Sequence, residues 1–264
     1  MAELEPLLSV RGLEVRERAF RGSSRYLLRG CDLDIHDGET VAVIGATGSG
    51  KTALGQALTR LARGVRCRGT VHLRGQPGNL LRASGWRLGR VRGGSIGYLF
   101  GATRGGLDSD VPVRAQMVEV LNRHRPEVKQ EEEEIVYWLS KAGLVDPENL
   151  MSARPRNMDL MVRTRVGIAI AMCAFPQVLV ADEPAAELDA ANQERILKLL
   201  GDLVEATGVA MLVLSRDFRV AIQLAERVVV LREGEIIEQG PLSAIINSPG
   251  NELTREILDF TPGR

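Results

Sequence analysis

Three short apolar runs in the chain have the pattern of strands buried on both faces of a sheet. They cover residues 40–44, 177–181 and 209–214, and amphipathic helices are predicted beside them over 52–63 and 190–206. Buried strands that alternate with helices are typical of a parallel α/β sheet. We therefore predict an α/β core.

Two further regions depart from this alternation. Residues 7–15 alternate between apolar and polar positions and residues 31–35 predict a second strand, so the N-terminal region is predicted to be rich in β-strands. Helical spacing from 113 to about 144 indicates a middle segment, roughly 85–165, that interrupts the α/β order and could be a subdomain. Trp86 and Trp138, which lie in this region, are expected to be packing residues.

A glycine-rich segment joins the first buried strand to the helix that follows it. It comprises Gly45, Ala46, Thr47, Gly48, Ser49, Gly50, Lys51 and Thr52, which matches the P-loop pattern at every required position. The glycines allow positive φ, so that backbone amides converge on a phosphate at a helix N-terminus. We expect Lys51 to reach the β- and γ-phosphates of ATP, and the Thr52 hydroxyl to bind Mg²⁺.

Two adjacent carboxylates follow the second buried strand. Asp182 is expected to hold Mg²⁺ through water, and Glu183 to polarise the attacking water as a general base. For adenine stacking, Phe20 is the first candidate and Tyr26 the second, although either ring could equally serve in strand packing. The predicted cofactors are therefore ATP and Mg²⁺.

Composition adds limits to the possible partners. The formal net charge of zero does not favour a nucleic-acid partner. The three cysteines are scattered, which indicates a reducing, cytoplasmic setting, and no segment approaches the ~20 apolar residues of a membrane span. If the protein acts at a membrane, we expect it to bind peripherally on the inner face of the cell membrane, with a partner doing the spanning.

With these motifs, the chain resembles the ATP-binding subunits of ABC transporters over nearly its whole length. Leu188 and Asp189 match the D-loop, and the sequences around Pro184 and Pro241 look most like the oligopeptide/dipeptide importer branch. The resemblance implies a single nucleotide-binding domain over 1–264. It also implies a P-loop NTPase core of the ABC ATPase type with an N-terminal antiparallel β subdomain. A helical subdomain at about 102–165 would be inserted into this core.

Three motifs of that family are altered in this chain. Gly101 stands where the family has a Gln that contacts Mg²⁺ and the attacking water, and Arg216 replaces the switch His. The Leu-Ser-Gly-Gly-Gln signature is replaced by a segment that contains Asp159, Leu160 and Met161. Loss of one preorganised transition-state contact typically costs ~10²–10³ in rate. We therefore expect a degenerate subunit in which hydrolysis is impaired.

The resemblance also implies how such a subunit assembles. Subunits of this family pair head to tail, so that each ATP lies between one P-loop and the signature of the other subunit. A homodimer would lack all three elements at both sites, and we therefore expect a heterodimer with a consensus ATPase subunit. Transmembrane permeases and, indirectly, a solute-binding protein would be the further partners.

The sequence leaves one alternative function open and disfavours another. The chain could be a regulatory or assembly module that uses ATP binding as a clamp in a soluble complex. An active stand-alone ATPase is disfavoured by the three altered motifs.

Overall fold

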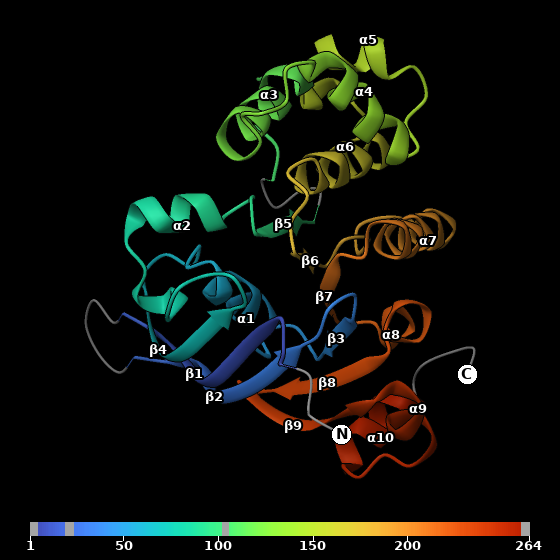
Figure 1. The fold of residues 1–264 in the computed structure, drawn as a ribbon. Coiled ribbons are helices and arrows are strands. Elements are labelled where there is room, and N and C mark those ends of the chain that lie inside the picture. Colours follow the sequence, from blue (N-terminus) through green and yellow to red (C-terminus); the bar gives the residue numbers. More distant parts are fainter. Residues whose placement is uncertain (1–4, 19–23, 102–105, 260–264) are drawn as a thin grey trace. The chain divides into compact units, whose positions relative to one another are not determined.

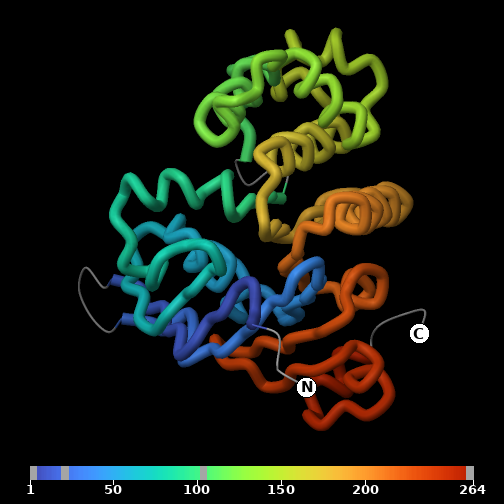
Figure 2. Tube along the Cα trace, viewed as in Figure 1, coloured from blue at the N-terminus to red at the C-terminus, as the bar shows by residue number. Residues whose placement is uncertain are grey.

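The computed structural model describes residues 5–18, 24–101 and 106–259. The chain divides into two compact units, one formed by 1–88 together with 210–264 and the other by 89–209. Figure 2 shows the blue N-terminal and orange-red C-terminal segments running side by side in the first unit. The first unit is therefore built from the two ends of the chain, and the second from its middle.

The first unit contains an antiparallel sheet and a mostly parallel one. Its elements are β1 (Leu8–Glu17), β2 (Tyr26–Ile35), β3 (Thr40–Ile44), α1 (Lys51–Leu58), β4 (Val65–Leu73), the 3₁₀ turn η1 (Leu80–Arg82), β7 (Ala210–Ser215), α8 (Phe218–Leu224), β8 (Arg227–Arg232), β9 (Glu235–Pro241), α9 (Leu242–Asn247) and α10 (Glu252–Asp259). In the antiparallel sheet β1 lies between β2 and β4. In the other sheet β3 pairs in parallel with β7 and β8, and β9 adds antiparallel to β8.

Strand β3 is the centre of this unit. All five of its residues are buried, as are all six of β7. This burial on both faces explains why the two segments are continuously apolar, whereas β1 buries alternate residues. The α/β core and the N-terminal antiparallel sheet predicted from the sequence are thus confirmed.

The second unit combines a pair of parallel strands with helices. Its elements are β5 (Ile96–Phe100), α3 (Val113–His124), α4 (Glu131–Lys141), α5 (Pro147–Ser152), the 3₁₀ turn η2 (Pro155–Asn157), α6 (Leu160–Met172), β6 (Val178–Asp182) and α7 (Ala190–Thr207), while α2 (Gly85–Val91) crosses the boundary between the units. Strands β5 and β6 pair in parallel. Helices α3, α4, α5 and α6 pack together, and α6 also contacts β5 (Figure 1).

The structure corrects two expectations about the described residues. Trp138 is buried in α4, where its indole N–H donates to Glu134 Oε1 at 2.9 Å, but Trp86 is 75% exposed and is not a packing residue. The helix predicted over 52–63 ends at Leu58, because Arg60 adopts a left-handed conformation with φ of 52°. Hydrophobic spacing alone does not reveal either feature.

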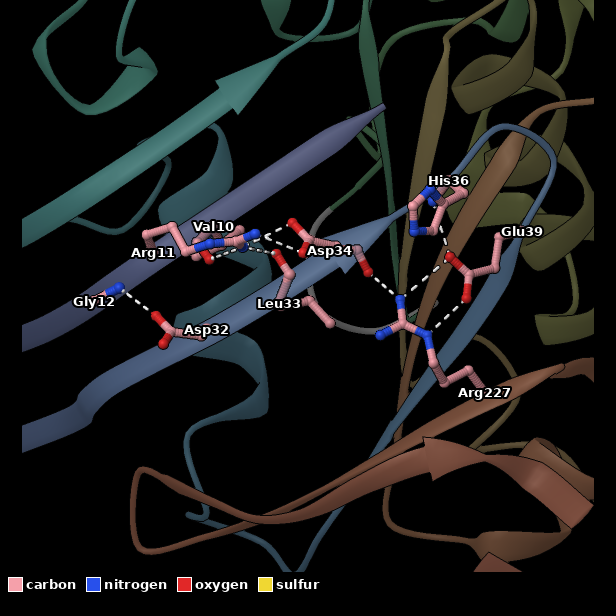
Figure 3. Close-up of polar contacts among 9 residues, drawn as sticks. All are labelled: Val10, Arg11, Gly12, Asp32, Leu33, Asp34, His36, Glu39 and Arg227. Carbon is pink, nitrogen blue, oxygen red and sulfur yellow. Dashed lines mark hydrogen bonds and ion pairs between the residues drawn. The ribbon is translucent and has the colours of Figure 1, made fainter. Parts of the chain in front are cut away.

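Polar contacts tie the antiparallel sheet to the buried strands within the first unit (Figure 3). Arg227, at the start of β8, donates to Glu39 Oε1 at 2.7 Å and also to the backbone carbonyl of Asp34 in β2. Glu39 Oε2 accepts from the backbone amide of His36 at 2.8 Å. Asp34 in turn forms a two-pronged ion pair with Arg11 of β1, at 2.7 and 2.6 Å. These contacts join β1, β2 and β8 through one chain of charges.

This network makes stability depend on the charge of Glu39. Burial alone would raise the pKa of Glu39, but the bonds from Arg227 and the His36 amide lower the pKa below its ordinary value of 4.5. A carboxylate with a lowered folded-state pKa contributes stability above its unfolded pKa, and this stability is lost as pH falls through the folded pKa. We expect Glu39→Gln to reduce the free energy of unfolding by about 1–3 kcal/mol at pH 7.

Urea unfolding followed across pH checks this expectation. The difference between wild type and Glu39→Gln should shrink as the pH falls below 4.5. The control is Asp37→Asn, in the turn that also contains Glu39. It breaks an ion pair between the 65% exposed Asp37 side chain and Arg74, which follows β4. Solvent screens such an exposed pair, so a larger loss for Asp37→Asn than for Glu39→Gln would contradict the assignment.

Candidate functional site

The glycine-rich loop leaves β3 at its carboxyl end and leads directly into α1. The register that pairs Ile44 with Ser215 continues one residue further, where the Gly45 amide donates to the Ser215 carbonyl at 3.3 Å. Helix α1 then begins at Lys51, with Gly50 at its N-cap. The sequence therefore forms the strand–loop–helix arrangement that presents backbone amides to an anion at a helix N-terminus.

Lys51 lies folded back along this loop. Its ammonium donates to the carbonyl oxygens of Gly45 at 2.6 Å and Ala46 at 3.0 Å, and to the Ser49 hydroxyl at 3.5 Å. Only 6% of Lys51 is exposed. A buried ammonium requires such partners, because an unpaired buried charge is costly. The loop thus holds a fixed positive charge next to the amides of the helix N-terminus.

Two glycines of the loop have conformations that a side chain would disturb. Gly50 has φ of 110°, and a Cβ built there would lie 2.4 Å from the Leu27 carbonyl oxygen. Gly48 has φ of 82°, but a Cβ there would meet nothing within 4 Å. The glycine at 50 is therefore required by both backbone conformation and space, and that at 48 by backbone conformation alone.

The turn between β8 and β9 forms a backbone hydrogen bond with the glycine-rich loop. The Gly234 amide donates to the Ser49 carbonyl at 2.8 Å, and the Gly234 carbonyl accepts from the Arg29 amide at 2.8 Å. Nothing in the local sequence pattern signals a contact between segments so far apart in the chain.

Arg216 lies beside the beginning of this loop. It follows Ser215, whose carbonyl accepts from Gly45, and it is exposed at the end of β7. Asp217 caps α8 and accepts from the side chain of Arg219 through both oxygens. Arg216 thus brings a permanently charged guanidinium to the edge of the sheet from which the loop emerges.

In the second unit, the two carboxylates stand at the end of β6. Asp182 is 1% exposed, and its Oδ2 accepts from the Tyr98 hydroxyl at 3.2 Å. Glu183, directly after the strand, has φ of 51°, which is uncommon for a residue with a side chain. Such a conformation costs about 1–3 kcal/mol, and it tends to occur where function requires a particular side-chain direction.

The three altered positions have distinct settings in the structure. Gly101 follows β5 and is buried, and Arg216 is the exposed residue described above. Asp159 is the N-cap of α6, where its Oδ1 accepts from the Val162 amide at 2.8 Å. Leu160 and Met161 form the first turn of that helix. The helix N-terminus is therefore capped by a carboxylate of its own chain.

The adenine candidates differ in what can be said of them. Phe20 lies outside the described residues. Tyr26 begins β2, and the guanidinium carbons of Arg16 and Arg29 lie 4.9 and 5.2 Å from its ring centroid. Tyr26 also lines a groove of about 480 Å³, together with Glu14, Arg16, Glu17, Arg18, Ser24, Arg66 and Arg68. An adenine would have to compete with these guanidinium groups for the Tyr26 ring.

Comparison with known proteins supplies the family. Residues 28–186 match the family described as ABC transporter, and the matched span includes the loop and both carboxylates. The chain belongs to the ABC transporter family. The predicted ABC ATPase fold, with its antiparallel subdomain, is therefore confirmed, and members of this family bind ATP. No helix in the described part of this ABC protein is long and apolar enough to cross a membrane.

Curated relatives and solved structures cover most of this ABC protein. It is 31% identical to the oligopeptide transport ATP-binding protein OppD of Bacillus subtilis, over 99% of this chain and 74% of OppD. It is 29% identical to the dipeptide transport ATP-binding protein DppD of the same organism, over 98% of this chain and 78% of DppD. Its fold resembles cbiO1 from Clostridium perfringens, part of the cbiONQ transporter complex, with a TM-score of 0.75, 24% identity and coverage of 98% and 97%.

A second solved structure supports the same fold. The dimeric ATP-binding cassette MJ0796, in a post-hydrolysis state bound to ADP and phosphate, gives a TM-score of 0.77 at 23% identity. The match covers 89% of this ABC protein and 98% of that chain. At this identity the likeness concerns the fold alone.

The two glycines provide a matched test of the loop geometry. We expect Gly48→Ala to lower the free energy of unfolding by about 1–2 kcal/mol, because an L-residue is strained at positive φ. Gly50→Ala should lose roughly 1–3 kcal/mol more, since its Cβ also collides with the Leu27 carbonyl. Urea unfolding of both variants checks this difference. Equal losses would show that the close approach to Leu27 does not determine the residue at 50.

Proposed function

We propose that this ABC protein is the ATP-binding subunit of an importer of peptides or similar small solutes, and that it hydrolyses ATP weakly or not at all. The importer assignment is supported by the names of the relatives, which include oligopeptide and dipeptide transport proteins. It is also supported by the sequences around Pro184 and Pro241, which resemble that branch of the family.

The observation that carries ATP binding is the position of Lys51. Its ammonium is fixed at the N-terminus of α1, within a loop whose amides and positive charge suit a phosphate chain. Residues 45–52 are the proposed phosphate site. Phe20 remains the proposed adenine contact.

The remaining polar groups of the motif fit a hydrated Mg²⁺. This ion prefers oxygen ligands and is usually held by one or two protein groups together with phosphates. Thr52 supplies a hydroxyl in the first turn of α1, and Asp182 supplies a buried carboxylate. Bound Mg²⁺ would neutralise charge that develops on the phosphates. Glu183 is proposed as the general base, and its left-handed backbone sets the direction in which its Cα–Cβ bond leaves the chain.

Three features support weak hydrolysis. Gly101 offers no side chain to position water, and Arg216 is a permanent cation that cannot accept a proton. The Asp159 carboxylate caps α6 through the Val162 amide, so that a phosphate approaching this helix N-terminus would meet a negative charge. Each change removes or opposes a contact that would stabilise the transition state.

These losses also suggest the partners. Pairing with a consensus ATPase subunit would give a heterodimer in which the partner supplies part of the hydrolytic machinery. We propose that this pair works on transmembrane permeases at the cytoplasmic face of the membrane, with a solute-binding protein acting indirectly. Within this assembly, residues 102–165 are the proposed helical subdomain of a single nucleotide-binding domain over 1–264.

Substitution of Lys51 tests ATP binding. We expect Lys51→Ala to weaken binding of MgATP to the purified chain by at least about tenfold, because charge-assisted hydrogen bonds to phosphate are lost. Isothermal titration calorimetry measures the affinity, and circular dichroism verifies the fold. Lys198→Ala is the control, since that lysine is 73% exposed and pairs with Asp202 in the same helix. Unchanged affinity in Lys51→Ala would show that nucleotide binds elsewhere.

Turnover tests the degenerate-subunit proposal. We expect the purified chain to hydrolyse ATP at least ~10²-fold more slowly than a complex that contains the consensus subunit. Any residual rate of the isolated chain should fall further in Glu183→Gln, because Glu183 is the proposed general base, and it should be unchanged in the control Glu205→Gln on the exposed side of α7. Rapid hydrolysis by the isolated chain that Glu183→Gln abolishes would refute weak turnover, while leaving ATP binding intact.

A further inference from the structure

A tyrosine hydroxyl contacts the buried carboxylate at the end of β6. Tyr98 Oη donates to Asp182 Oδ2 at 3.2 Å. The two residues come from neighbouring parallel strands, in which Tyr98 pairs with Val180 and Phe100 with Asp182. The hydroxyl therefore reaches along the face of the sheet to the carboxylate two positions further on. Tyr98 was not among the site residues expected from the sequence.

The surroundings hold this tyrosine in place. The ring centroids of Tyr98 and Phe100 are 4.3 Å apart, with the planes tilted by 35°. Leu99, between them, is buried against the other face of β5. A ring held by its neighbour loses little freedom when its hydroxyl makes a hydrogen bond. The contact is therefore preorganised by the strand and does not depend on a flexible side chain.

The hydrogen bond from Tyr98 orients the Asp182 carboxylate. A hydrogen bond to Oδ2 restricts rotation of the carboxylate about its last side-chain bond, and so it also fixes the direction of Oδ1. Outer partners of this kind set the orientation of metal-binding groups, and their removal lowers metal affinity. Apart from the tyrosine, β5 consists of Ile, Gly, Leu and Phe, so Tyr98 is the one residue of this strand with a polar side chain.

We propose that Tyr98 is a positioning residue that orients Asp182 for Mg²⁺ and thereby couples the metal ion to ATP binding. The inference rests on the proposed role of Asp182. It concerns the phenol hydroxyl specifically, because Phe at this position would preserve the ring, its contact with Phe100 and the packing of β5. If Tyr98 had only a structural role, its substitution would change the ATP affinity equally with and without Mg²⁺.

The experiment compares ATP affinities in the presence of Mg²⁺ and of EDTA, using calorimetry on the full chain. For Tyr98→Phe we expect the ratio of these affinities to fall roughly tenfold. This is the lower end of the cost of losing an outer partner, since 3.2 Å is long for a hydroxyl–carboxylate bond. Affinity in EDTA should stay at the wild-type value. The matched control is Tyr137→Phe, which removes a hydroxyl from a 45% exposed tyrosine in α4.

A second background tests whether Tyr98 acts through the carboxylate. In an Asp182→Asn chain, Tyr98→Phe should cause no further change in the affinity ratio, because coupled residues are not additive. A wild-type ratio in Tyr98→Phe, or an equal loss of affinity in Mg²⁺ and EDTA, would overturn the inference and leave the proposed function standing. A wild-type chain that binds no ATP under either condition would overturn both.

Discussion

The complete burial of β3 is the constraint on which the first unit depends. A strand flanked in parallel by β7 and β8 can satisfy its backbone only within the sheet, and its side chains must be apolar on both faces. Its carboxyl end is therefore a fixed point. The loop that follows starts from a defined place and direction, which the bond between the Gly45 amide and the Ser215 carbonyl extends by one residue.

The loop is also supported by parts of the chain that are distant in sequence. The β8–β9 turn reaches it through Gly234, and Arg227 at the other end of β8 joins the antiparallel sheet through Glu39 and Asp34. Strand β8 thus connects to the glycine-rich loop at its carboxyl end and to β2 at its amino end. This arrangement explains how the half-buried antiparallel sheet keeps a defined position against the buried strands of the same unit.

Much of the fold and of the candidate site could be predicted because it follows from local pattern. The apolar runs in the sequence predicted β3, β6 and β7, and the spacing of the glycines and Lys51 predicted the loop. Features that depend on pairs of distant residues were not accessible, such as the hydroxyl of Tyr98 against Asp182. The left-handed conformation of Glu183 could not be predicted either, because glutamate rarely adopts positive φ. Trp86 misled because its size suggests burial, whereas its surroundings leave it exposed.

The internal bonds of Lys51 bear on how a nucleotide could be released as well as captured. A phosphate must compete with two carbonyl oxygens and a hydroxyl that already accept from the same ammonium. The binding free energy is then the difference between two states, one in which the Lys51 ammonium bonds to the loop and one in which it bonds to phosphate. It is smaller than the full energy of a new ion pair. Such an exchange keeps the buried charge compensated throughout binding and release. This exchange suits a cycle in which the nucleotide both binds and dissociates in every turn.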